Sequence, residues 1–126
     1  MTRLFPLMGI LLIGCGPDEL APGEESAIVP VECDRSPPLD YDNFGAGFMA
    51  RNCTGCHSSG LGEGERFGAP DLVDLDSLGS VDIWGYRIHA RAIQDATMPP
   101  GGGIPEEDLA LLDEWLQCDV FEELDQ

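Results

Sequence analysis

The sequence predicts an all-α domain with three main helices, and three observations support this fold class. Apolar residues recur at helical spacing in three separate segments of the chain. Glycine-rich stretches separate these segments, as is typical of loops between helices. No alternation of apolar and polar residues of comparable strength indicates a strand. Because 126 residues leave room for little more than one domain, we expect the helices to share one core.

The first helix is predicted over residues 42–52. Phe44 and Phe48 lie four residues apart and therefore share one face of it. Gly45 and Gly47 lower its helix propensity, but they also allow another part of the chain to come close. We therefore expect a helix crossing at these glycines.

The second helix is predicted to begin near Ser80, a residue favoured at the N-cap, with Asp82 in its first turn. Its apolar stripe consists of Val81, Trp84, Ile88 and Ala92. The sequence places this stripe on the buried face of the helix.

The third helix is predicted to begin at Pro105, which three acidic residues follow at the positive end of the helix dipole. Its buried stripe is expected to comprise Leu109, Leu112, Trp115 and Leu116. Asp113 and Glu114 are expected to face water.

Residues 1–14 have the pattern of an export signal, with Arg3 before an apolar stretch over residues 4–13. That stretch is too short to span a bilayer as a helix. It ends in a motif that resembles the bacterial lipobox, Leu12-Ile13-Gly14-Cys15. The resemblance implies cleavage before Cys15, acylation of that residue and a lipoprotein outside the cytoplasmic membrane, facing the periplasm or the cell exterior. The alternative is an ordinary signal peptide that contains a cysteine.

Residues 15–38 are rich in proline and acidic residues and show no helical or strand period. We interpret them as the lipidated cysteine followed by a disordered tether. The folded domain is then expected over residues 39–126.

The chain carries 24 acidic residues against six basic ones, for a formal charge of −18. A field of this sign repels phosphate backbones, so nucleic-acid binding is not expected. It favours protein partners with a basic docking face. The alternative is that the charge serves only solubility outside the cell.

The segment Cys53-Thr54-Gly55-Cys56-His57 is the strongest chemical signal in the chain. Two thiols three positions apart can bond the two vinyl groups of haem, and the adjacent histidine can bind the iron. A thiol–disulfide pair is a rival interpretation, but it requires a βαβ context. A zinc site would need two further ligands, and Cys33, Cys118 and His89 offer no paired spacing. The long segment 58–79 that follows is consistent with a loop wrapped around a flat cofactor.

With this motif, residues 41–118 resemble the class I c-type cytochromes. Two more motifs carry the resemblance: Ala69-Pro70-Asp71-Leu72, similar to the family's Gly-Pro-x-Leu segment, and Met98-Pro99-Pro100, similar to its distal-ligand loop. The acidic start and Leu/Trp stripe of the last predicted helix are also similar to the family. The resemblance implies a cytochrome c fold around one covalent haem c, with the Pro70 carbonyl accepting a hydrogen bond from His57.

The resemblance also implies that Met98 is the second axial ligand, opposite His57. The alternatives are a Met98 that fills a gap in the core, coordination by His89, or an open or water-bound position. Met49 is expected to pack rather than to bind iron. Arg87 and Arg91 lie four residues apart, and either could bind a haem propionate or form part of a solvated helix face.

In class I cytochromes the first and last helices pack across each other, which implies a disulfide between Cys33 and Cys118. Two unpaired thiols, buried or intermolecular, are the alternative. The predicted function is electron transfer: a lipid-anchored mono-haem cytochrome that shuttles single electrons between membrane or periplasmic redox partners and is not itself an enzyme. The alternatives are a haem-based sensor or small redox enzyme with an open distal site, and a non-redox lipoprotein.

Overall fold

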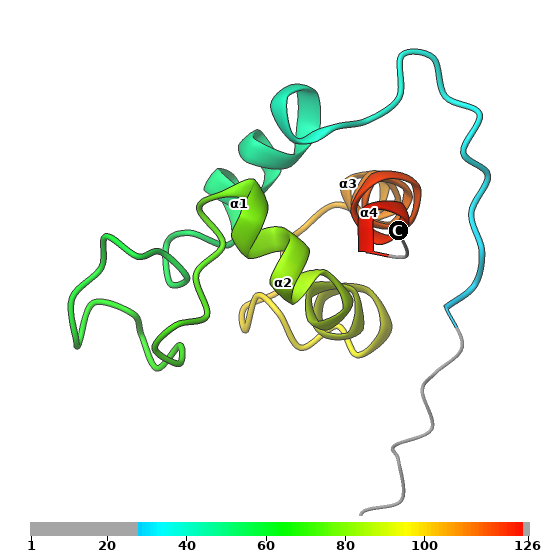
Figure 1. Ribbon diagram of the computed structural model, residues 1–126. Coiled ribbons are helices and arrows are strands. Elements are labelled where there is room, and N and C mark those ends of the chain that lie inside the picture. The colour runs from blue at the N-terminus through cyan, green and yellow to red at the C-terminus, as the bar shows by residue number, and fades with distance from the viewer. Residues whose placement is uncertain (1–27, 125–126) are drawn as a thin grey trace, which may run out of the picture.

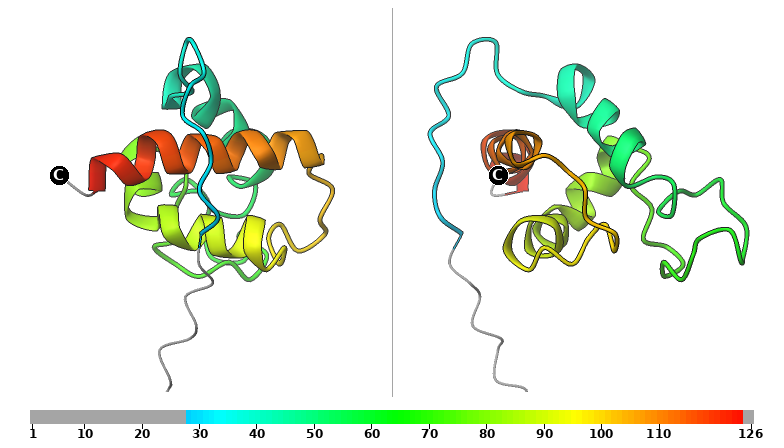
Figure 2. Two further views of the ribbon diagram at one scale, coloured as in Figure 1. Left: turned by 90° about the vertical axis from the view of Figure 1, so that its right-hand side faces the viewer. Right: turned by 180° about the vertical axis from the view of Figure 1, so that it is seen from behind.

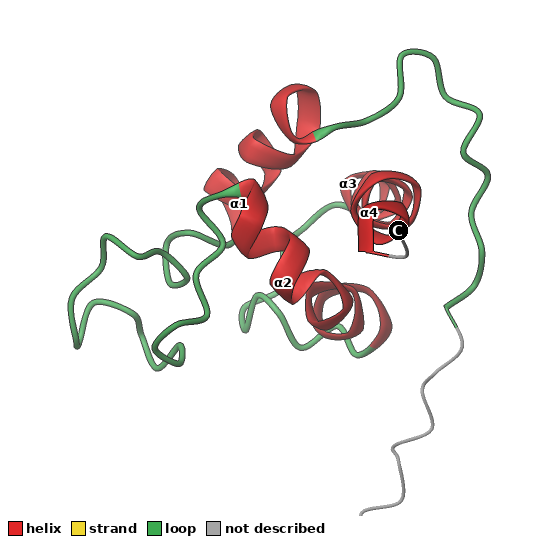
Figure 3. Cartoon of the chain, viewed as in Figure 1, coloured by secondary structure: helices red, strands yellow, loops and turns green. Residues whose placement is uncertain are grey.

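The computed structural model describes residues 28–124, and every regular element in this range is helical (Figure 3). In chain order the elements are η1 (Tyr41–Gly45), α1 (Ala46–Asn52), α2 (Leu78–Ile88), η2 (His89–Gln94), α3 (Glu106–Trp115), η3 (Leu116–Val120) and α4 (Phe121–Leu124). The η elements are π-helical and continue the adjoining α-helices, so the described chain forms three helical rods. The prediction of an all-α domain with three main helices is confirmed.

The rods begin close to the predicted residues, but their capping differs. Ser77 caps the second rod, because its hydroxyl accepts a hydrogen bond from the Ser80 backbone N–H at 3.2 Å. Ser80, the predicted cap, therefore lies inside α2. Pro105 is the capping residue of α3 rather than its first helical residue, and its carbonyl accepts the N–H groups of Asp108 and Leu109 at 3.0 Å.

The C-terminal rod, α3 to α4, packs against both other rods (Figure 1 and Figure 2). The core lies along this rod and contains Phe48, Met49, Leu75, Val81, Ile88, Ala92, Leu112, Trp115, Leu116, Val120 and Phe121. Most residues of the predicted stripes are among them, whereas Trp84 and Leu109 are only partly buried. Met49 is 1% exposed, which confirms that it packs rather than faces a ligand site.

Trp115 and Gly45 form the contact between the first and last rods. Trp115 is fully buried, and its ring meets that of Phe44 edge-on, with the ring centroids 5.9 Å apart. A Cβ at Gly45 would overlap the Trp115 ring, whereas a Cβ at Gly47 would point into open space. The expected helix crossing is therefore confirmed at Gly45 and absent at Gly47.

We predict that Gly45→Ala lowers the free energy of unfolding by at least about 1–3 kcal/mol, because the indole must move out of a closely packed site. Gly47→Ala is the matched control. It should leave stability unchanged or raise it by up to about 1 kcal/mol through helix propensity. Chemical denaturation of the two variants measures both effects, and equal stabilities would contradict the packing described.

The segment before the first rod crosses the C-terminal rod, which Figure 2 shows from two sides. Cys33 and Cys118 form a disulfide, as expected from the resemblance. The Gln117 side chain donates to the Val29 carbonyl at 3.0 Å and accepts from the Val31 N–H at 3.3 Å. The tether predicted through residue 38 is therefore wrong for residues 28–38, which these contacts hold against the domain.

The polar face of α3 serves as an attachment surface, which corrects the expectation that Asp113 and Glu114 simply face water. Glu114 accepts two hydrogen bonds from the Arg35 guanidinium, which lower the pKa of this carboxyl. Asp113 accepts from Gln117 at 2.7 Å and lies 2.9 Å from Nε2 of His89. His89 is only 3% exposed, and this contact gives its buried ring a polar partner.

We predict that replacing both Cys33 and Cys118 by serine lowers the free energy of unfolding by about 3–5 kcal/mol, because the disulfide closes a long loop in the unfolded chain. Arg35→Ala removes a partly exposed ion pair of the same attachment and should lower the free energy of unfolding far less than the loss of the disulfide does. Denaturant titration of both variants separates the two contributions. A double serine variant as stable as the parent would contradict the disulfide's role.

Within residues 28–124, no helix has the length and apolar character needed to cross a bilayer. The predicted export signal, the lipidation at Cys15 and the first part of the tether lie outside the described residues.

Candidate functional site

The segment from Cys53 to His57 continues the first rod as tight turns. The Cys53 and Thr54 N–H groups donate to the Met49 carbonyl at 2.8 and 3.0 Å. The N–H groups of Cys56 and His57 in turn donate to the Cys53 carbonyl at 3.1 and 2.9 Å. This winding keeps both thiols and the imidazole within one short, ordered stretch at the end of α1. Neither Cys53 nor Cys56 forms a disulfide.

The Cys53 thiol does not have the lowered pKa of a reactive redox cysteine. Burial raises the pKa of Cys53 to about 11, whereas the reactive cysteines of thiol oxidoreductases have lowered pKa values. The βαβ context that a thiol–disulfide pair requires is also missing from the described part of the chain. A zinc site is not supported either, because residues 28–124 hold no group of three or more His, Cys, Asp and Glu side chains placed to bind a metal ion.

His57 is oriented by the loop that follows it. Its Nδ1 lies 3.0 Å from the Val73 carbonyl. A carbonyl only accepts, so Nδ1 carries the hydrogen and Nε2 keeps the lone pair that a metal would bind. The expected acceptor, Pro70, is wrong here. The Pro70 carbonyl instead accepts a hydrogen bond from Nη2 of Arg66 at 3.0 Å.

Residues 58–77 form a long loop, which projects from the helices in Figure 1. Its two ends are joined beside His57: the Leu75 N–H donates to the His57 carbonyl at 2.9 Å. Asp76 accepts from the hydroxyls of Ser58 and Ser59 at 2.8 and 2.9 Å and from the Ser59 N–H at 2.9 Å. The loop is therefore closed at its base by polar contacts, which place the Val73 carbonyl within reach of the imidazole.

Arg66 holds the interior of this loop, and sequence reasoning did not single it out. The residue is 6% exposed, and its two terminal nitrogens donate to four acceptors. These acceptors are the carbonyls of Ser58, Pro70 and Val73 and the carboxylate of Asp74. The only available signal was a lone arginine in a glycine-rich loop, which is too weak to predict burial.

Two large apolar side chains lie exposed beside these groups. Phe67 follows Arg66 and is 85% exposed, and Leu72 precedes Val73 and is 82% exposed. Both have positive φ angles, 51° and 70°, which bulky residues rarely adopt. Phe67 and Leu72 therefore combine an exposed apolar side chain with a strained backbone conformation.

Met98 lies in the loop between η2 and α3. Its N–H and that of Thr97 donate to the Arg91 carbonyl at 3.0 and 2.8 Å, which attaches the start of this loop to the second rod. The Met98 residue is 39% exposed, so the alternative of a core-filling methionine is wrong. His89, the alternative ligand, presents its Nε2 to Asp113 and is buried.

The arginines considered for propionate binding differ in their surroundings. Arg91 pairs with Asp95 at 3.1 Å on the surface, which is the solvated role considered for it. Arg87 is exposed on α2. Neither side chain is brought by a described contact to the Cys53–His57 segment.

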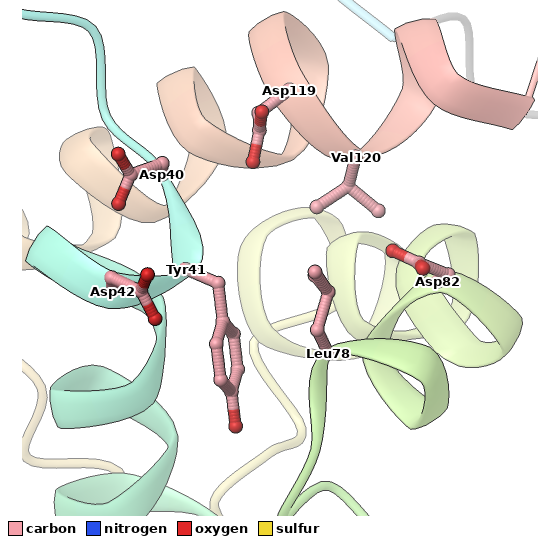
Figure 4. Close-up of a pocket in the computed structure, with 7 residues that line it drawn as sticks. All are labelled: Asp40, Tyr41, Asp42, Leu78, Asp82, Asp119 and Val120. Atoms are coloured by element: carbon pink, nitrogen blue, oxygen red, sulfur yellow. The ribbon is translucent and has the colours of Figure 1, made fainter.

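A surface hollow of about 350 Å³ lies elsewhere, where η1, the start of α2 and the C-terminal rod meet (Figure 4). It is lined by Asp40, Tyr41, Asp42, Leu78, Asp82, Asp119 and Val120. Two of its carboxylates already have structural partners: Asp40 caps the first rod, and Asp119 accepts from the Trp115 indole at 3.0 Å. None of its lining residues belongs to the Cys53–His57 segment or to the loop over residues 58–77.

No protein-family model matches this chain, and no curated protein or solved structure matches it either. The function is therefore inferred from the residues and their geometry.

We predict that the loop over residues 58–76 loosens as the pH falls below about 4. The hydrogen bonds from Ser58 and Ser59 lower the pKa of Asp76, so their stabilising effect is present above its unfolded pKa and is lost as the pH falls through the folded value. Hydrogen-exchange protection factors across the loop measure this. Asp76→Ala should lose the protection already at pH 7.

Glu63→Gln, a change at an exposed residue of the same loop, is the control for removing a carboxylate. It should retain the parent's protection at pH 7 and its acid transition. If Asp76→Ala behaved in the same way, the proposed closure of the loop by Asp76 would be contradicted.

Proposed function

We propose that this protein is an electron-transfer protein, a mono-haem c-type cytochrome held by Cys53, Cys56 and His57. The observation that carries the proposal is the imidazole of His57. Its Nδ1 is bound to the Val73 carbonyl, and it follows directly on a turn with two unpaired thiols. This arrangement leaves Nε2 as the metal-binding atom and supplies both sulfurs for covalent attachment.

The residues present fit a haem on three counts. The thiols are not consumed by a disulfide, the tautomer of His57 suits metal ligation, and Phe67 and Leu72 offer apolar surface on the loop that orients His57. When bound, the group supplies a reversible one-electron iron couple. Cys53 and Cys56 would retain it, and His57 and Met98 would supply the two ligands to its iron.

A carrier is favoured over an enzyme because a second axial ligand closes the iron to substrates. Met98 is available for this role because its side chain is partly exposed rather than packed into the core. The same exposure is also compatible with the alternative function, a haem-based sensor or small redox enzyme whose distal site stays open. The two candidates differ in whether Met98 sulfur binds the iron.

The remaining proposals concern where electrons come from and go. A formal charge of −18 favours redox protein partners with a basic docking face and disfavours nucleic acid. We propose that lipidation at Cys15 holds the protein at the outer face of a membrane, toward the periplasm or cell exterior. Arg87 is the better candidate of the two arginines for a propionate, since Arg91 is paired with Asp95.

The test is a visible spectrum of the full chain, made in a host with c-haem maturation machinery and recorded in the oxidised and reduced states. We expect sharp reduced bands that stay with the denatured chain, and a weak far-red band of iron–methionine ligation in the oxidised state. Met98→Ala should keep the covalent haem, lose the far-red band and bind carbon monoxide. Ile83→Ala, at an exposed apolar residue of α2, should change none of these.

Two outcomes would redirect the proposal. Covalent haem without the far-red band in the parent, together with carbon monoxide binding, would favour the open-site sensor or enzyme. Absence of haem in the parent under these conditions would overturn the cytochrome altogether.

A further inference from the structure

The Val73 carbonyl accepts two hydrogen bonds. One comes from Nδ1 of His57 at 3.0 Å and the other from Nη2 of Arg66 at 3.1 Å. An oxygen with two donors is a weaker acceptor for each of them than it would be for one alone. The contact therefore links a buried cation to the imidazole through a single atom.

Resting on the proposed function, we propose that Arg66 is a positioning residue for His57, which both places the imidazole and raises the reduction potential of the iron. Arg66 does not touch the imidazole. It acts through the Val73 carbonyl, whose oxygen orients the ring and accepts a hydrogen bond from each of the two side chains.

The placing role follows from the acceptors of the guanidinium. Nη1 donates to the Ser58 carbonyl at 2.7 Å and to Asp74 at 2.9 Å, while Nη2 donates to the carbonyls of Pro70 and Val73. One planar group thus joins the residue directly after His57 to the far side of the loop. Only a guanidinium offers donors in this fixed fork, so lysine is not an equivalent replacement.

The electronic role follows from the same contacts. A strong acceptor on Nδ1 makes an imidazole a better electron donor, which stabilises ferric iron. Arg66 weakens that acceptor, and its buried positive charge disfavours the additional charge of the ferric state. Asp74, at 2.9 Å, and Asp71, 3.9 Å from Nε, offset part of this charge. Both effects raise the potential, so their loss should lower it.

A purely structural arginine is the competing explanation, and the holoprotein distinguishes the two. We expect Arg66→Met to change the ratio of ferric to ferrous protein, at a fixed solution potential, by about three- to tenfold toward ferric. For a one-electron couple this is at most about 59 mV. The haem-methyl shifts in the proton NMR spectrum of the ferric protein, which report the orientation of the axial imidazole, should move as well.

Glu63→Gln is the matched control, because it changes an exposed residue of the same loop and leaves both the contacts of Arg66 and the base of the loop in place. It should leave the ferric-to-ferrous ratio and the methyl pattern close to those of the parent. If Arg66→Met lowers loop protection as Asp76→Ala does, but leaves both readouts unchanged, Arg66 is only structural and the inference is overturned.

If Arg66→Met yields no holoprotein, Arg66→Lys decides, because it keeps the cation and loses the fork. A shift of the ratio in the same direction, smaller than tenfold, and a changed methyl pattern support the inference. If Arg66→Lys keeps both the parent's ferric-to-ferrous ratio and the parent's methyl pattern, the inference is overturned. A parent chain that binds no haem overturns the proposed function, whereas a parent holoprotein with no response at Arg66 overturns only this inference.

Discussion

The contact of Trp115 with Gly45 relates the first helical rod to the last, and the other parts of the molecule are placed by these two rods. The indole occupies the space that any side chain at residue 45 would need, and its N–H is held by Asp119. The Cys53–His57 segment continues from the first rod, and the N-terminal segment is attached to the last by the Cys33–Cys118 disulfide. One apolar contact therefore determines how the candidate site and the attached segment lie relative to each other.

The candidate site itself depends on polar contacts rather than apolar ones. Of residues 58–77, only Arg66 and Leu75 are buried, so hydrogen bonds must order this loop. They converge on His57, whose carbonyl and Nδ1 are both engaged by residues from the end of the loop. An imidazole oriented in advance loses little freedom when it binds a metal. A small domain gains from this, since it has too little core to bury a large cofactor.

The structure also limits the chemical roles open to the cysteines and histidines. The raised pKa of Cys53 argues against a reactive thiolate at this residue, and the contact of His89 with Asp113 engages one of the two ring nitrogens of this buried histidine. Met98, in contrast, is left partly exposed on a loop attached to the second rod. The proposed ligand pair of His57 and Met98 thus uses an imidazole that is oriented through its Nδ1 and a methionine that lies outside the core.

The three helices and most of their buried stripes could be predicted from the sequence, because helical periodicity is a local property. The pairing of Cys33 with Cys118 was expected only from a resemblance. The chemistry of the Cys53–His57 motif is likewise local, since it depends on residue types at fixed spacing. The sequence could not predict the acceptor of His57, the burial of Arg66 or the attachment of residues 28–38. Each of these depends on hydrogen bonds between residues whose approach is decided by loop closure and helix packing, so only the tertiary structure determines them.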